Sequence, residues 1–184
     1  YTAPTATPQN KTTTITLELN VKGKQVLLIS TLHIIEEGIL ISLDGGAWKT
    51  YPGMATKVPE LGVFSLGSLR IAADVPQIVL MWPALSTKAD GIYHWSMQGN
   101  EISDVVLEYA TPNLSRVYTA EYMDQNHNWR SSGGFLAVEE ITEKDKKYLT
   151  GMFAVDQAGV IDSQMGEQTR IGSVAGTFKV LRNW

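Results

Sequence analysis

Three aromatic side chains stand beside turn sequences, where a ring is available to bind a partner. Trp48 and Tyr51 lie close to the pair Gly45 and Gly46, and Trp129 follows an asparagine-rich stretch. Trp and Tyr rings stack on sugar rings and anchor protein partners, because each combines a large apolar face with a polar edge. We therefore predict these three aromatic residues as the binding residues of the protein.

The sequence lacks the spacings on which common hydrolytic sites depend. A serine nucleophile elbow needs Gly-x-Ser-x-Gly, and the nearest sequence, Gly62 to Gly67, places Ser65 at the wrong spacing. A metalloprotease helix needs two histidines four residues apart, but the three histidines of this chain are scattered. We predict no catalytic residue and no enzyme. A glycosidase-type hydrolase, which needs only two suitably spaced carboxylates, is the less favoured alternative.

Metal and cofactor sites are not predicted either. His33, His94 and His127 each stand on or beside a predicted strand. The segment 124–128 (DQNHN) begins like a calcium-binding loop, but its sixth position is Trp129 where such a loop needs glycine, and its twelfth position is not glutamate. We interpret this segment as a polar turn between two strands, and we predict no metal and no cofactor.

Charge and hydropathy exclude several classes of partner. A net charge of −4 leaves no broad basic surface for nucleic acid or anionic lipid. The longest apolar stretch, residues 26–35, covers about ten residues, whereas a helix that spans a bilayer needs roughly 20. The chain has no cysteine, which excludes disulfides and thiol chemistry. We predict no nucleic-acid partner and no transmembrane segment.

The elements that must position these side chains are short strands joined by turns. Turn sequences rich in Gly, Pro, Asn and Asp separate segments of alternating or continuous apolar residues. No stretch keeps apolar residues at helical spacing. We predict an all-β fold, an antiparallel two-sheet sandwich or barrel of about ten short strands with little helix. The predicted strands are 14–21, 25–32, 39–43, 69–73, 77–82, 92–95, 105–109, 117–122, 134–141, 149–155 and 174–181.

The predicted domain organisation has two parts. Residues 1–38 hold a Thr- and Pro-rich tail and a hairpin, and residues 39–184 form the β-sandwich domain. We predict that residues 1–21 mediate self-association, in which the first strand joins the sheet of a neighbouring subunit through main-chain hydrogen bonds. Light scattering tests this hypothesis, because identical monomer masses with and without the tail over a wide concentration range would remove it.

The order of short motifs from Ile41 onward resembles a known family. A Gly-led hairpin is followed by two strands that each carry a Gly-x-Phe sequence, Leu149-Thr-Gly-Met-Phe153 and Gly176-Thr-Phe-Lys-Val180. These features are similar to an uncharacterised family of small secreted lipoproteins from Bacteroidetes, known only as a domain of unknown function. The resemblance covers about 140 residues and implies an all-β fold and export. Its other motifs are Ile41-Ser-Leu-Asp-Gly45, Trp48, Leu69-Arg-Ile71, Ile78-Val-Leu80, Gly91-Ile-Tyr93, Ser131-Ser-Gly-Gly134 and Glu140-Ile-Thr142.

Two functional hypotheses follow from the sequence. The first is a non-enzymatic extracellular or cell-surface β-sandwich module with a binding or assembly role, whose ligand is a glycan or a protein. The alternative is a carrier domain that encloses a small apolar molecule or presents a carbohydrate-binding face. The sequence starts at Tyr1 with a Thr- and Pro-rich stretch, which is typical of a processed exported chain. Together with the resemblance, this start indicates an outer-surface location on a bacterium.

Overall fold

The computed structural model describes residues 12–21, 24–33, 36–69, 72, 74–84, 89–97 and 104–184, with side chains from Glu36 onward. The chain divides into two compact units, Tyr1–Glu36 and Glu37–Trp184. The sequence placed the boundary two residues later. No helix in the described ranges is long and apolar enough to cross a bilayer.

The first unit contains a single two-stranded hairpin among its described residues. Strand β1 (Thr12–Val21) pairs antiparallel with β2 (Lys24–His33), and the register places Leu17 opposite Leu28 and Leu19 opposite Val26. The predicted first strand therefore finds a partner within its own chain along one edge. Residues 1–11 of the proposed self-association segment lie outside the described part of the chain.

The second unit is built almost entirely of strands, which confirms the predicted all-β class. Its one described helical element is the short 3₁₀ turn η1 (Pro59–Leu61). The strands are β3 (Gly38–Leu43), β4 (Lys49–Tyr51), β5 (Gly53–Val58), β6 (Val63–Ser68), β7 (Gln77–Pro83), β8 (Gly91–Tyr93), β9 (Val106–Ala110), β10 (Arg116–Thr119), β11 (Glu121–Met123), β12 (Trp129–Ser131), β13 (Gly134–Glu143), β14 (Lys146–Asp162) and β15 (Glu167–Arg182).

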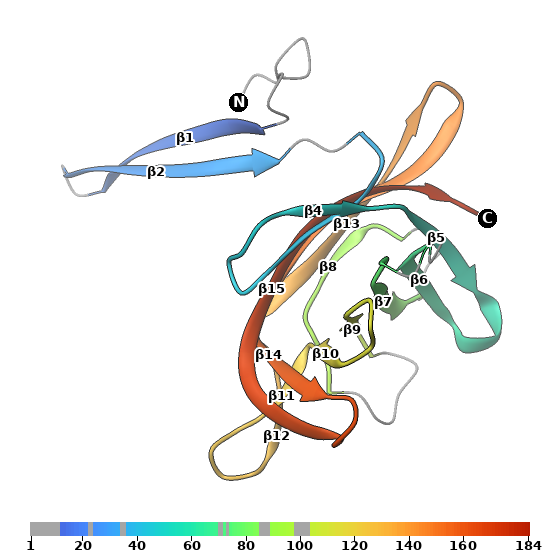
Figure 1. The fold of residues 1–184 in the computed structure, drawn as a ribbon. Helices are drawn as coiled ribbons and strands as arrows, with labels where there is room; N and C mark the ends of the chain where they lie inside the picture. Colours follow the sequence, from blue (N-terminus) through green and yellow to red (C-terminus); the bar gives the residue numbers. More distant parts are fainter. Residues whose placement is uncertain are drawn as a thin grey trace. The chain divides into compact units, whose positions relative to one another are not determined.

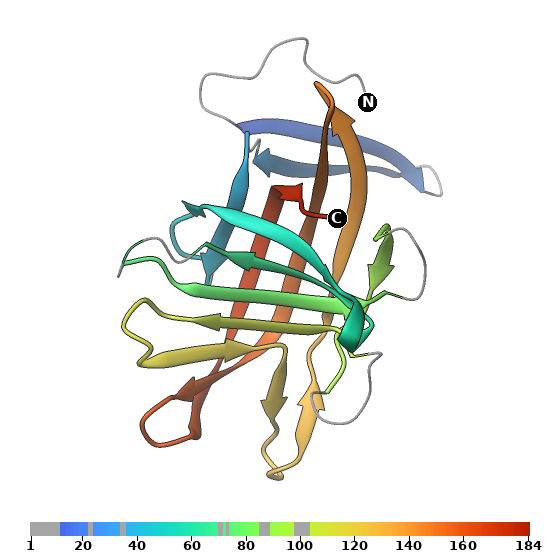
Figure 2. The ribbon, with the colours of Figure 1, turned by 90° about the vertical axis from the view of Figure 1, so that its right-hand side faces the viewer.

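Eleven of these strands form one sheet that closes on itself. Neighbouring pairs run from β15 through β5, β6, β7, β9 and β10 to β14, and β14 pairs again with β15. In Figure 1 the long strands β14 and β15 curve along one side of this circuit. Figure 2 shows β5, β6, β7, β9 and β10 (teal to olive) side by side, with β14 and β15 crossing behind them. The circuit leaves two layers of strands facing each other across the core.

One contact in this circuit departs from the predicted antiparallel arrangement. Among the described strands, β15 and β5 pair in parallel, through Leu181 opposite Met54 and Arg182 opposite Ala55. Strand β3 is antiparallel to β15, and β4 is antiparallel to β3, so that β4 runs in the direction of β15. Pro52 separates β4 from β5, and proline has no N–H to continue a ladder. The chain therefore leaves β3 at Pro52 and reaches the edge of β15 still running parallel to it.

A bulge lets β14 change partners on its other edge. Residues 146–155 of β14 pair with β13, and residues 159–162 pair with β10. Between these ladders the register against β15 shifts after Val155, as a β-bulge requires. The backbone N–H groups of the bulge form hydrogen bonds outside these ladders. That of Asp156 donates to Gly133 O (3.1 Å), and that of Gln157 donates to Ser132 Oγ (3.0 Å).

The predicted strand at 69–73 is wrong at its described residues, Leu69 and Ala72, neither of which lies in a strand. The strand in this region is β6, and Leu69 follows its end, while residues 70, 71 and 73 are outside the described part of the chain. Phe64 and Leu66 of β6 are fully buried and alternate with half-buried Ser65. This alternation is the strand signal, and it places Ser65 within a strand and not on a nucleophile elbow.

The charged segment 139–147 is a hairpin, and its strands extend further toward the turn than the predicted strands 134–141 and 149–155 do. Strand β13 ends at Glu143 and β14 begins at Lys146, so that only Lys144 and Asp145 form the turn. Both residues have positive φ, 50° and 64°, the geometry of the two-residue type I′ turn that matches the twist of a hairpin.

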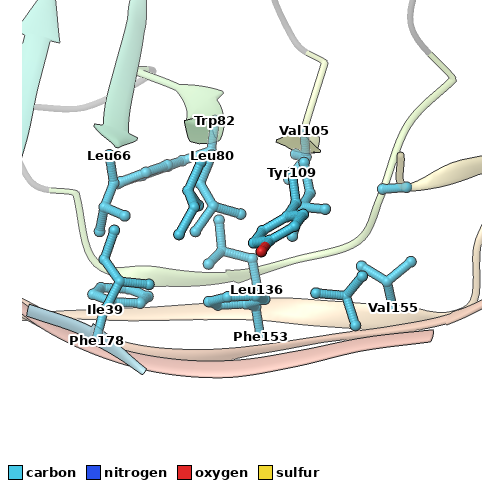
Figure 3. Close-up of a cluster of buried hydrophobic side chains, with 14 of the residues drawn as sticks. Ile39, Leu66, Leu80, Trp82, Val105, Tyr109, Leu136, Phe153, Val155 and Phe178 are labelled. Atoms are coloured by element: carbon cyan, nitrogen blue, oxygen red, sulfur yellow. The ribbon is translucent and has the colours of Figure 1, made fainter. Parts of the chain in front are cut away.

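The core lies between the two layers of the circuit. Leu66, Leu80 and Trp82 point from one layer toward Ile39 and Phe178 of the other (Figure 3), and all five are fully buried. The Phe side chains of the two Gly-x-Phe sequences cover glycines on the neighbouring strand. Phe153 is opposite Gly176, and Phe178 is opposite Gly151. Each motif therefore supplies a phenyl ring that covers the glycine of the other motif, and the two contacts hold β14 and β15 in this register.

Candidate functional site

Two of the three predicted binding residues lie on one extended segment of the structure. Trp48, whose side chain is 38% exposed, precedes β4, and Tyr51 is the half-buried last residue of β4. They line two different hollows, which are described below. Trp129 (42% exposed) belongs to the separate β11–β12 hairpin, where it is opposite Met123. The predicted trio is therefore not one site.

The first hollow, here called the inner pocket, opens beside the end of β3 and has a volume of about 260 Å³. Alternate residues of β3 and of the segment 47–51 point toward it, because successive side chains of an extended chain point to opposite faces. Apolar groups and aromatic rings form most of its wall, and one ammonium group is present. The lining residues are Ile41, Leu43, Ala47, Lys49, Tyr51 and Tyr109.

Two tyrosine hydroxyls meet at the inner pocket. Tyr109 of β9 is 4% exposed, and its ring points into the core in Figure 3. Burial raises the pKa of Tyr109, and the neighbouring phenol of Tyr51 raises it further. Its ring also packs edge-on against Tyr118, with centroids 5.9 Å apart. Tyr109 therefore keeps its proton at physiological pH, and the two phenols add hydroxyl groups to the wall of the pocket.

The second hollow, here called the outer hollow, lies on the opposite face of β3, β14 and β15 and has a volume of about 320 Å³. Ser42, Ala175 and Ala154 follow one another across the three strands. Their small side chains leave room above the sheet, and Trp48 and Asp156 stand at its edge. The lining residues are Ser42, Gly45, Trp48, Ala154, Val155, Asp156, Ser173, Val174 and Ala175.

A charged network, here called the Asp44 network, fixes the segment between the two hollows. The Asp44 carboxylate accepts hydrogen bonds from Arg170 Nη2 (2.5 Å), Tyr118 Oη (3.0 Å) and Ser173 N–H (3.0 Å). Arg170 also donates to Tyr118 Oη (2.9 Å). The hydrogen bond from Arg170 is the main cause that lowers the pKa of Asp44. Burial, followed by the hydrogen bond to Asp44, raises the pKa of Tyr118. The network ties the chain before Trp48 to β10 and β15.

A second ion pair, which is half-buried, links β13 to β15. Glu140 pairs with Arg182, and its Oε1 accepts a hydrogen bond from Ala89 N–H at 2.9 Å. The guanidinium of Arg182 stacks on Trp184, which in turn packs on Phe64 with ring centroids 5.2 Å apart. All of these groups hold chain segments together, and they are structural.

The predicted turn at 124–128 is present between β11 and β12. Asp124 accepts hydrogen bonds from the N–H groups of Asn126 (2.8 Å) and Asn128 (3.0 Å) and pairs with Arg130 at 2.9 Å. These bonds lower the pKa of Asp124, the one from Asn128 most strongly. Its carboxylate is thus engaged in the turn itself. Within the described residues there is no group of three or more potential metal ligands.

The arrangement provides groups for binding. The inner pocket contains no carboxylate, and the outer hollow contains one, Asp156, whereas glycoside hydrolysis uses two. Sequence reasoning identified Trp48 and Tyr51 but missed Lys49, Tyr109 and the Asp44 network. Alternation around Tyr51 points to Lys49, since both stand on one face of an extended segment. Tyr109 lies in a distant strand, and no local signal connects it with Tyr51.

Comparison with known proteins identified no relative. No protein-family model, curated protein or solved structure matches this chain.

Proposed function

We propose that this protein is a non-enzymatic binding module whose inner pocket takes a small apolar molecule. The observation that carries the proposal is the inner pocket itself, in which Ile41, Leu43 and Ala47 form an apolar wall beside the Tyr51–Tyr109 pair. Ligand sites are typically concave, mostly apolar, and provided with a few fixed polar groups that orient the ligand. The mouths of closed sheets are among the places where such sites occur.

The structure around the pocket favours a preformed site. Ile41 is 2% exposed and Tyr109 is 4% exposed, so both are held by the core. The Asp44 network holds the chain directly after Leu43. A wall that is already ordered loses little conformational entropy when a ligand binds.

N-phenyl-1-naphthylamine, a neutral apolar fluorophore, tests the proposal. We expect saturable binding to the wild type with one site per chain, measured by fluorescence titration. Ala47→Trp should weaken binding by at least about tenfold, because a large ring on the exposed rim fills the pocket and excludes the probe. Trp129→Ala, in the separate β11–β12 hairpin, is the matched control and should bind as the wild type does. Equal affinity of Ala47→Trp and wild type would overturn the proposal.

The outer hollow supports a second candidate function, the binding of a carbohydrate. An indole ring beside hydroxyl and carboxylate groups is suited to a sugar, because the ring stacks on the C–H face while Ser42, Ser173 and Asp156 offer hydrogen bonds. On a glycan array, Trp48→Ala should lose the signal that Trp129→Ala retains. No wild-type signal above background would remove this candidate.

Two further proposals concern partners and location. Self-association through residues 1–21 is supported by the two-stranded β1–β2 sheet, because an isolated hairpin is only marginally stable and gains from added strands. An extracellular or cell-surface location is supported by the resemblance to secreted lipoproteins. Measuring the protein in culture medium, membrane and cytosolic fractions of its source cell tests the location, and a purely cytosolic distribution would contradict it.

A further inference from the structure

The chemistry of the inner pocket says more about its ligand than its shape does. We propose that the ligand is an apolar molecule that carries an anionic head group, held at the rim by Lys49 and the Tyr51–Tyr109 pair. This inference rests on the proposed function, because it assumes that the inner pocket is a binding site.

Lys49 gives the pocket a positive charge. It is the one charged residue in the lining, and the chain as a whole carries a net charge of −4. In the described part of the chain, no ion pair involves Lys49. A cation at the rim of a pocket in an acidic protein attracts an anion and repels a cationic competitor.

The nearest acidic residue in the sequence does not neutralise this charge. Asp44 follows Leu43 of the pocket wall, but its two carboxylate oxygens accept hydrogen bonds from Arg170, Tyr118 and Ser173. Arg170 forms the ion pair with Asp44. The positive charge of Lys49 is therefore available to a ligand.

The tyrosine pair adds a hydrogen-bond donor next to this charge. Each phenol carries one O–H group. Tyr51 and Tyr109 both line the pocket, and their O–H groups can donate to an acceptor there. An anionic oxygen accepts such a proton more strongly than a neutral group does.

The rest of the wall fixes the other end of the ligand. Ile41, Leu43 and Ala47 offer only hydrocarbon, and burying a ring or a short alkyl chain against them is favourable, whereas burying a second charge is costly. The volume of about 260 Å³ suits a small molecule of two or three rings. The predicted class is therefore a small aromatic or alkyl acid.

A matched pair of fluorophores separates this inference from the proposed function. 8-Anilinonaphthalene-1-sulfonate has the ring system of N-phenyl-1-naphthylamine with an added sulfonate. Wild type should bind the sulfonate more tightly. Lys49→Met, which keeps an unbranched side chain of nearly the same length but removes the charge, should weaken sulfonate binding about fivefold. The same change should leave binding of the neutral probe unaltered. Lys49→Arg should restore the sulfonate affinity.

Lys146→Met is the control for a general effect of charge, because Lys146 is exposed in the β13–β14 hairpin. It should bind both probes as the wild type does. If Lys49→Met and wild type bind the sulfonate equally, or if Lys146→Met weakens it as much, the inference is overturned and the pocket remains a neutral binding site. If neither probe binds the wild type, the proposed function itself fails.

Discussion

Replacing Gly176 with alanine is expected to lower the free energy of unfolding by about 3 kcal/mol, at the upper end of the cost of overpacking a core. A Cβ atom at this position would lie 2.2 Å from Cζ of Phe153 and 2.9 Å from the carbonyl oxygen of Leu40. Phe153 is 2% exposed and packed in the core, so its ring has no free space into which it can move. Urea unfolding, followed by tryptophan fluorescence, measures the loss as a lower midpoint at an unchanged m value.

Two further variants show whether the covering ring is the cause. Gly176→Ala combined with Phe153→Leu should be less unstable than the sum of the two single variants, because the shorter side chain vacates the space that the Cβ needs. Gly166→Ala is the control outside the core, since no atom lies within 4 Å of its Cβ and only its φ of 70° opposes the change. Its cost should be about 1 kcal/mol. A strictly additive double variant would contradict the role assigned to Phe153.

The same pair of strands shows how far the sequence predicts the fold. Alternation and equal Gly-x-Phe spacing predict two strands with Phe153 and Phe178 inside them. They do not predict that each ring faces the glycine of the other strand, because this depends on the register between strands. The β-bulge after Val155, which sets the register beyond it, has no local sequence signal that distinguishes it from a regular strand.

The closure of the sheet could not be predicted from the sequence for a similar reason. The parallel contact between β15 and β5 joins Arg182 to Ala55, more than one hundred residues earlier in the chain. Pro52 signals only that a ladder stops, and not which edge the chain reaches next. The residues of the candidate site were likewise predictable only where a local sequence signal marks them. Trp48 and Tyr51 were predicted because both stand close to the turn at Gly45 and Gly46, whereas Tyr109 acquires its role from a strand contact that no local pattern encodes.

The second large effect is expected at the Asp44 network. Asp44→Ala should lower the free energy of unfolding by about 2 kcal/mol, the usual range for losing hydrogen bonds to a charged group. The side chain is 34% exposed, which keeps the loss below that of a fully buried pair. The φ of 53° at this position adds to the cost, because alanine adopts the left-handed region less readily than aspartate does.

Asp44→Asn isolates the charge from the backbone conformation and the shape. Asparagine tolerates positive φ and keeps one acceptor oxygen. Tyr118 and Ser173 donate to different oxygens of Asp44, so asparagine keeps one of these two hydrogen bonds. It should therefore cost less than alanine does, and the remaining loss should reflect the ion pair with Arg170 and the other hydrogen bond. Because the network holds the chain between the two hollows, Asp44→Ala should also weaken binding of the neutral probe, whereas Asp44→Asn should not.

The advantage of wild type over Asp44→Asn should depend on pH in one direction. The pKa of Asp44 is lowered in the folded protein, mainly by its hydrogen bond with Arg170. A carboxylate with a lowered pKa stabilises the folded state in full above the pKa of unfolded aspartate, about 3.9. This contribution disappears as the pH falls below that value and passes the folded pKa, where the carboxylate takes up a proton. Urea midpoints measured from pH 7 to pH 3 should therefore show a constant gap between the two proteins down to about pH 5 and a shrinking gap below it. A gap that stays constant to pH 3 would show that Asp44 gains no stabilisation from its charge, and the role of the network would then rest on its hydrogen bonds alone.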